Sequence, residues 1–251
     1  MNKTNLKLAK TERYLLVVCL VFLVGFLLVT FYRTSFHPVD VEVNLWIPSI
    51  QSGTLTFFAE GVAVIFGTAS LVLMSLVISS ILFLKNYKTH SLLFLVAMGG
   101  DALIVSVTKI LEHVARPTNG ILYDTSFSYP SGHSAGVIVF SGFLAYFGWR
   151  HWQSTRSRTL IGAGLGALVG VVGFDRVYLN VHWLSDVVGG WLFGAFWLSF
   201  VIFIFVQLKM SEEFKSERFG LISKVVFLVA FVVAVFVFLF SVFGNFLGFS
   251  F

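Results

Sequence analysis

Apolar runs of about 20 residues recur along almost the whole chain, and they limit the folds that it can adopt. Only 12% of the 251 residues are charged and 57% are hydrophobic, whereas about a quarter of the residues in a soluble domain are charged. A run of about 20 apolar residues is long enough to cross a bilayer as an α-helix. The sequence therefore predicts an all-α, polytopic bundle of transmembrane helices. The candidate spans are residues 14–32, 55–84, 91–113, 133–149, 159–177, 183–208 and 221–244.

These runs are expected to form one integral-membrane domain, because no low-complexity linker or long-period repeat divides the chain. Residues 14–208 would form a six-span core, and residues 221–244 an appended seventh span. The run at 55–84 is longer than a bilayer requires, so we expect it to tilt or to project from the membrane. Small residues recur on one face of two other runs, a pattern typical of closely packed spans. They are Gly162, Gly166 and Gly170, and Gly190 and Gly194.

The charge and cysteine content exclude several classes of function. The net charge is +5, but the basic residues are spread over short connecting segments and are not interleaved with aromatic residues, so nucleic-acid binding is not expected. Cys19 is the single cysteine, which leaves no intrachain disulfide and no cysteine-based metal site. We therefore predict neither a metal nor a cofactor. The sequence does not indicate an oligomeric state.

The distribution of Lys and Arg predicts which way the chain faces. Cytoplasmic loops carry an excess of these residues. If the N-terminus is cytoplasmic, only Arg33, Lys109, Arg116 and Arg176 of the 17 basic residues fall on the outer side. Three of these four belong to short polar clusters that interrupt the apolar runs. We therefore expect a multi-pass protein of the cell membrane whose polar clusters share the extracytoplasmic face.

The first cluster pairs Lys109 with Arg116, followed by Pro117. Residues seven apart lie on nearly the same face of an α-helix, about 10 Å apart along its axis. Their long side chains could close around one anion, and Pro117 is expected to end the helix. A structural alternative is that both residues anchor a span end at the interface.

The second cluster is the tetrapeptide Pro130–His133, at the start of the fourth run. Ser131 is a candidate N-cap, and the N–H groups of Ser131, Gly132 and His133 would point from a helix N-terminus, a position that favours anions. His133, in the first turn, is placed to exchange protons with water or a leaving group. The alternative is an ordinary helix cap.

The third cluster contains Arg176, His182 and Asp186. Positions 182 and 186 are adjacent on a helix face, so the carboxylate could bond to one ring nitrogen and leave the other as a nucleophile. Arg176 could reach the same pocket and neutralise phosphate oxygens. A buried polar contact at a span end is the structural alternative. Glu60 and Asp101, inside the second and third runs, could line the site or a water-filled path, and the alternative for Asp101 is pairing with a neighbouring span.

Taken together, the three clusters resemble the type 2 phosphatidic acid phosphatase family. The order and spacing of its motifs fit between residues 109 and 186. They are matched by Lys109, Arg116 and Pro117; by Pro130, Ser131, Gly132 and His133; and by Arg176, His182 and Asp186. One position departs from the pattern, because Asp175 stands where the family has a serine. Asp175 is therefore a candidate modulator of phosphate binding. We expect its carboxylate to face the bound phosphate; the alternative is that it points away and pairs with a basic or amide group at the end of the fifth span.

The resemblance implies metal-independent hydrolysis of a lipid phosphate in two steps. His182 would attack phosphorus to form a phosphohistidine, Asp186 would orient that ring, and His133 would protonate the leaving oxygen. The phosphate would be held by Lys109, Arg116, Ser131, Gly132 and Arg176.

The substrate would be a membrane lipid that enters the site laterally. A polyprenyl (undecaprenyl-type) diphosphate is favoured, because its phosphates must be removed on the outer face when the carrier is recycled. Phosphatidylglycerophosphate, phosphatidic acid and transfer of the phosphoryl group to another lipid remain alternatives. A second class of function, a non-catalytic lipid-phosphate transporter, would need the cations but not an aligned nucleophile and acid.

Overall fold

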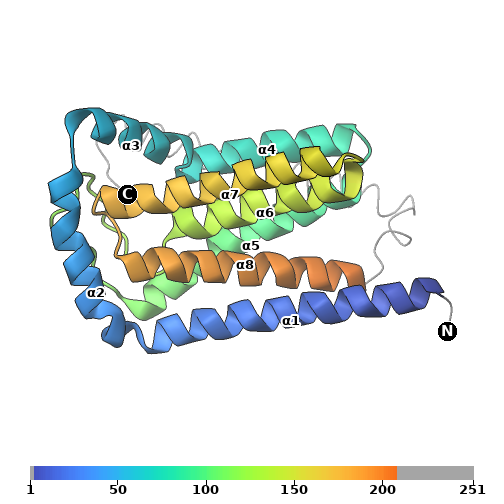
Figure 1. Ribbon diagram of the computed structural model, residues 1–251, viewed down its shortest axis with the longest axis horizontal. Coiled ribbons are helices and arrows are strands. Elements are labelled where there is room, and N and C mark those ends of the chain that lie inside the picture. Colours follow the sequence, from blue (N-terminus) through green and yellow to red (C-terminus); the bar gives the residue numbers. More distant parts are fainter. Residues whose placement is uncertain (1–2, 208–251) are drawn as a thin grey trace.

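The computed structural model describes residues 3–207 as a helical bundle, with no strand among those residues (Figure 1). The prediction of an all-α fold is confirmed. The predicted seventh span, residues 221–244, lies outside the described residues. The helices are α1 (Lys3–Phe31), α2 (Arg33–Trp46), the short 3-10 helix η1 (Ile47–Ile50), α3 (Gly53–Ile65), α4 (Thr68–Leu84), α5 (Lys88–Glu112), α6 (Gly132–His151), α7 (Thr155–Tyr178) and α8 (Leu184–Gln207).

Several of these helices are long and apolar enough to cross a bilayer. Within the described residues, four single helices meet this condition, in α1, α5, α7 and α8. The pair α3 and α4 meets it as one broken span bent by 50°. These helices make the chain a multi-pass membrane protein.

The long second run is broken, where the sequence predicted one tilted or projecting span. The break falls at Phe66 and Gly67, between α3 and α4. A Cβ atom at Gly67 would lie only 2.9 Å from the carbonyl oxygen of Ala63. Glycine therefore permits the chain to turn tightly at this point.

Close packing of α6 against α8 brings two of the polar clusters together. A Cβ atom at Gly190 would lie 2.5 Å from the carbonyl oxygen of Ser131, and one at Gly194 would lie 2.6 Å from that of Ala135. The small residues of α8 thus allow backbone contact with the start of α6, as the sequence predicted. The prediction is not met for α7 within the described residues, because a Cβ at Gly162, Gly166 or Gly170 would have none of their heavy atoms within 4 Å.

One end of the bundle gathers the segments that carry the motifs. The C-terminal ends of α5 and α7 and the N-terminal ends of α6 and α8 all lie there, and α2 crosses this end at a steep angle to the long helices (Figure 1). The α6–α7 connection lies at the opposite end. The topology therefore places the three polar clusters on the same side of the bundle.

Candidate active site

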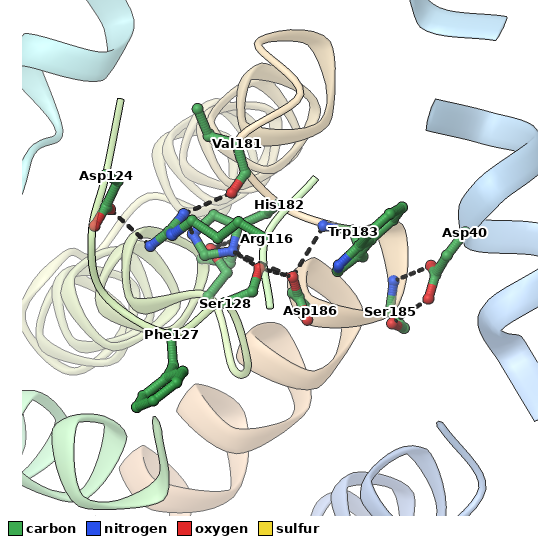
Figure 2. Close-up of polar contacts among 12 residues, drawn as sticks. Asp40, Arg116, Asp124, Phe127, Ser128, Val181, His182, Trp183, Ser185 and Asp186 are labelled. Atoms are coloured by element: carbon green, nitrogen blue, oxygen red, sulfur yellow. Dashed lines mark hydrogen bonds and ion pairs between the residues drawn. The ribbon is translucent and has the colours of Figure 1, made fainter. Parts of the chain in front are cut away.

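His182 is the centre of the polar contacts at this end of the bundle. Its ring is buried in the loop between α7 and α8. Nδ1 lies 3.3 Å from Asp186 Oδ2, and Nε2 lies 3.2 Å from Arg116 Nη1 (Figure 2). A guanidinium can only donate, so Nε2 accepts this hydrogen bond and the neutral ring carries its proton on Nδ1. The ring thus presents a lone pair on Nε2, the form required of a nucleophile.

Asp186 is fixed by three groups on one oxygen. Its Oδ2 accepts hydrogen bonds from the Ser128 hydroxyl and from the backbone N–H of Trp183, at 2.9 Å in the second case, in addition to its contact with His182. Asp186 lies in the first turn of α8, whereas His182 precedes that helix by two residues. The predicted pair is therefore formed, but across a helix start and not along one helix face.

The charge state of His182 follows from its surroundings. Burial lowers its pKa well below the ordinary value, and the positive charges of Arg116, Lys109 and Arg176 lower it further. Because a protonated ring would be poorly solvated and repelled by three cations, His182 is neutral at neutral pH. The same three cations are the ones that the sequence analysis assigned to phosphate binding.

Arg116 reaches the site from a loop, and this corrects the helical geometry expected from the sequence. α5 ends at Glu112, because His113 adopts a left-handed conformation with φ 48°. The helix therefore stops before Pro117, and Lys109 and Arg116 do not share one helix face.

Hydrogen bonds to two loops hold the Arg116 guanidinium in place. Nε donates to the Ser126 carbonyl at 2.8 Å, and Nη1 donates to the Val181 carbonyl at 2.5 Å. Nη2 lies 2.6 Å from Asp124 Oδ2 (Figure 2). Burial alone would raise the pKa of Asp124, but Arg116 and hydrogen bonds from Ser126 hold it below its ordinary value. Asp124 therefore stays ionised beside the guanidinium.

Lys109, in the last turn of α5, is joined to the same loop. Its Nζ donates to the carbonyl of Phe127 and, at 3.3 Å, to that of Ser128. The loop at residues 124–128 thus holds both cations, and through the Ser128 hydroxyl it also contacts His182 Nδ1 at 3.2 Å. Sequence reasoning missed Asp124 and Ser128, because neither belongs to a motif. The only sequence feature that could have suggested a role for them is their position in the loop just before the Pro130–His133 motif.

The Pro130–His133 segment lies directly beside Asp186. The Ser131 N–H donates to the Asp186 carbonyl at 3.0 Å, and α6 begins at Gly132. Ser131 occupies the predicted N-cap position, but its side chain makes no capping bond; its hydroxyl accepts from Ser134 at 3.0 Å. His133 is partly exposed in the first turn and interacts electrostatically with Arg176 and His182.

Asp175 and Arg176 form a buried ion pair at the end of α7. Nε of Arg176 donates to Asp175 Oδ2 at 2.9 Å, and Nη2 donates to the same oxygen. Arg176 still contributes positive charge near both histidines. The carboxylate that departs from the family pattern is therefore paired with a basic group, the alternative to the phosphate-facing orientation that the sequence favoured.

The other intramembrane acids are not part of this cluster. Glu60 is exposed on α3. Asp101 is 3% exposed on α5, facing α6, where a Cβ at Gly136 would lie 3.7 Å from its Oδ2. Among the residues that the structure describes, no group of three His, Cys, Asp or Glu side chains is arranged to hold a metal ion.

Comparison with known proteins identifies the family. Residues 90–211 match the model of the PAP2 superfamily, and this range contains every motif residue from Lys109 to Asp186. The chain carries a PAP2 superfamily domain. The resemblance inferred from the motifs is confirmed.

Named relatives of this PAP2 protein are phosphatases. Phosphatidylglycerophosphatase B of Bacillus subtilis (strain 168) is 27% identical over 190 residues, covering 75% of this chain and 90% of that protein. An undecaprenyl-diphosphatase of Sulfolobus acidocaldarius is 38% identical over 92 residues, covering 37% and 38% of the two chains. The chain is therefore an enzyme of a lipid phosphatase family, as predicted.

A solved structure shares the fold. The crystal structure of a transmembrane PAP2-type phosphatidylglycerolphosphate phosphatase from Bacillus subtilis superposes with a TM-score of 0.68 at 24% identity. The match covers 79% of this chain and 98% of that chain. It supports the membrane-spanning bundle described above.

Proposed function

We propose that this PAP2 phosphatase hydrolyses the terminal phosphate of a membrane lipid through a phosphohistidine on His182, without a metal ion. The main support for the proposal is that each ring nitrogen of His182 has a different partner. Asp186 lies at Nδ1, and Nε2 faces the guanidinium of Arg116. A phosphate that accepts hydrogen bonds from Arg116 would thus lie next to the nucleophilic nitrogen.

In the first step, the Nε2 lone pair attacks phosphorus and the bond from phosphorus to the leaving oxygen breaks. His133 donates its proton to that oxygen, which leaves as the lipid alcohol or lipid monophosphate. Asp186 stabilises the positive charge that develops on the imidazole ring through its contact with Nδ1.

In the second step, water attacks the phosphohistidine and the phosphorus–nitrogen bond breaks. His133, now neutral, accepts a proton from the water, and inorganic phosphate leaves. Nε2 recovers its lone pair and His133 its proton, so the enzyme returns to its starting state.

The positive charges match the charge that grows on the phosphoryl oxygens in both steps. Lys109, Arg116 and Arg176 all act electrostatically on His182, so their charges would also act on a phosphate bound next to Nε2. The backbone N–H of Gly132 lies at the start of α6, where a helix terminus favours an anion, whereas that of Ser131 already donates to the Asp186 carbonyl. Fixed cations and donors of this kind stabilise a phosphoryl-transfer transition state.

Two lipid phosphates are the leading substrates. Phosphatidylglycerophosphate is favoured by the relative named for that activity, because 90% of that protein aligns with this chain. Polyprenyl diphosphate, favoured by the sequence analysis, is supported by the shorter match to an undecaprenyl-diphosphatase. We place phosphatidylglycerophosphate first because its relative aligns over more of the domain.

The proposed site faces the extracytoplasmic side, with a cytoplasmic N-terminus. The distribution of Lys and Arg supports this orientation. Lipid would reach the site laterally from the outer leaflet, and the phosphatase would then act on the substrate pool of that leaflet.

A panel of lipid phosphates tests the proposed activity and its substrate together. Detergent-solubilised enzyme is incubated with phosphatidylglycerophosphate, polyprenyl diphosphate and phosphatidic acid, and released phosphate is measured against the His182→Ala variant as a blank. The expected result is the highest kcat/KM for phosphatidylglycerophosphate. Transfer of phosphate to another lipid without phosphate release would identify a phosphotransferase, and no reaction with any lipid would contradict the proposal.

A further inference from the structure

Asp40 links α2 to the first turn of α8. It accepts two hydrogen bonds from Ser185, one from the backbone N–H at 2.8 Å to Oδ1 and one from the hydroxyl at 2.6 Å to Oδ2 (Figure 2). The two residues are 145 positions apart in the chain, and Asp40 is 4% exposed. α2 lies outside residues 90–211, the part that matches the PAP2 family model.

The contact supplies a helix cap that the local sequence cannot provide. α8 begins at Leu184, so Trp183 occupies the N-cap position. The first N–H groups of a helix need acceptors, which an N-cap Ser, Thr, Asp or Asn usually provides. The indole of Trp183 has no acceptor, and its N–H donates to the Ala115 carbonyl at 2.8 Å.

Asp186 forms the other half of a capping box at the same helix end. Its Oδ2 accepts from the backbone N–H of Trp183 at 2.9 Å, as an acidic residue at the third helical position does. Asp40 then takes the place of the missing N-cap side chain by accepting from the Ser185 N–H. Asp186 Oδ2, which contacts His182, thus belongs to the first turn of α8. In the same turn, the Ser185 N–H is bound by Asp40 of α2.

Val43 of α2 and Ile47 of η1 pack in one apolar cluster with Leu184 and Val187 of α8, so α2 is joined to this turn by apolar as well as polar contacts. A cavity of about 330 Å³ also lies at this contact, lined by side chains of α2, of the loop that follows α5 and of the segment at the start of α8. Arg33 and His37 line it from the α2 side, and Trp183 and Ser185 from the α8 side. The two hydrogen bonds of Asp40 therefore make a direct polar connection across a region where close packing is incomplete.

We propose that Asp40 is a positioning residue of this phosphatase, which holds the first turn of α8 so that Asp186 keeps His182 aligned for attack. The inference rests on the proposed phosphohistidine mechanism. It extends the functional unit beyond the family domain to α2. A shift of about 1 Å in a catalytic group can lower a rate by on the order of a hundred-fold, so loss of this cap should reduce kcat without removing any group that binds phosphate.

The test compares four variants of the full chain on the preferred lipid substrate. Asp40→Ala removes both acceptors. Asp40→Asn keeps an oxygen for the Ser185 N–H, and Ser185→Ala removes one of the two bonds. Glu42→Ala, which changes an exposed acid on the same helix, is the matched control. For each, kcat, KM, the single-turnover rate of phosphoenzyme formation and Tm are measured.

We expect Asp40→Ala to lower kcat and the rate of phosphoenzyme formation by about ten- to a hundred-fold, with KM within about two-fold of wild type. Asp40→Asn should restore most of the rate, Ser185→Ala should lie between them, and Glu42→Ala should match wild type. If Asp40→Ala cannot be purified folded, the order of Asp40→Asn and Ser185→Ala relative to wild type decides the question.

Two results would overturn the inference while leaving the proposed function intact. One is an active wild type whose kcat is unchanged in Asp40→Ala. The other is a fall in Tm and a rise in KM, with kcat retained, which would indicate a purely structural role. By contrast, a wild type that releases no phosphate from any lipid and forms no phosphoenzyme would count against the proposed function itself.

Discussion

Asp175 and Arg176, which are neighbours in the sequence, are also ion-pair partners, and both side chains are at least 95% buried. The sequence analysis favoured an Asp175 carboxylate that faces the phosphate, and the structure instead shows the alternative, in which it pairs with a basic group. The observed pairing uses two nitrogens of Arg176, so Asp175 both orients this guanidinium and reduces its net charge. These two effects of the carboxylate can be separated by substitution.

Asp175→Asn keeps an acceptor for Arg176 but removes the negative charge. We expect a lower KM, because like-charge repulsion of the phosphate is removed, and the gain should shrink at high salt. Asp175→Ala leaves the Arg176 charge buried without its partner, a change that typically costs about 3–5 kcal/mol, so Tm should fall. KM at low and high salt and Tm are the measurements. Identical KM values in all three proteins would show that Asp175 does not affect phosphate binding.

Substitution of the two histidines should separate the nucleophile from the acid. His182→Ala removes the nucleophile, so turnover and the acid-labile phosphoenzyme should both disappear. His133→Ala should slow formation of the intermediate by about 10²–10⁴-fold, and most for poor leaving groups, which need protonation. Rapid-quench labelling and mapping of the labelled residue are the measurements. Phosphate attached to His133 would show that the assigned roles are reversed.

The low pKa of His182 predicts an unusual acid limb in the pH–rate profile. Burial and the charges of Arg116, Lys109 and Arg176 hold this pKa well below the ordinary value of 6.5. The ring stays neutral as the pH falls through 6.5, so kcat/KM should decline only at lower pH. Arg116→Gln removes one opposing charge and should move the acid limb to higher pH, besides weakening phosphate binding. An acid limb at the same pH in both proteins would contradict this origin of the shift.

The lowered pKa of His182 also makes the stability of the folded chain depend on pH. Because the pKa of His182 is lower in the folded chain, the unfolded chain takes up the proton first as the pH falls. The contribution of His182 is therefore present above about pH 6.5 and is lost as the pH falls through the folded-state pKa. His182→Gln should lose less stability than wild type between neutral and acidic pH. The measurement is Tm as a function of pH for the two proteins.

Chelators should leave the activity unchanged, because cationic side chains supply the charge that a metal would otherwise provide. Lys109, Arg116 and Arg176 all act on the position of His182. Orthovanadate, which imitates a five-coordinate phosphoryl group, should inhibit. Phosphate release with and without EDTA is the measurement, with vanadate titrated in parallel. Activity that is lost with EDTA and restored by a divalent metal would argue directly against the histidine mechanism.

The proposed orientation can be tested with single cysteines. The residues Tyr123–Ser128 lie at the motif-bearing end of the bundle, and the α6–α7 connection, which includes Ser154, lies at the other (Figure 1). After Cys19→Ser, a cysteine at Tyr123 should react with an impermeant thiol reagent in intact cells, and one at Ser154 should not. If only Ser154→Cys were labelled, the chain would have the opposite orientation, and the substrate pool would lie in the cytoplasmic leaflet.

The amino-acid sequence by itself determined the fold class and predicted the chemical components of the candidate site. Long apolar runs require helices in a membrane, because a bilayer cannot satisfy exposed backbone groups. The motif residues Lys109, Arg116, His133, Arg176, His182 and Asp186 could be assigned because their types and spacing match one family pattern. Both signals are local, so they survive without knowledge of how the helices pack.

The tertiary structure alone decided how these components are held. Ser128 contacts His182 from 54 positions away, and Asp40 caps α8 from 145 positions away. Neither contact has a sequence signal, because it depends on how loops and α2 pack over the end of the bundle. The helix geometry expected for Lys109 and Arg116 failed for a related reason. His113 turns left-handed and ends α5 early, and the loop at residues 124–128 then holds both cations through its carbonyl groups.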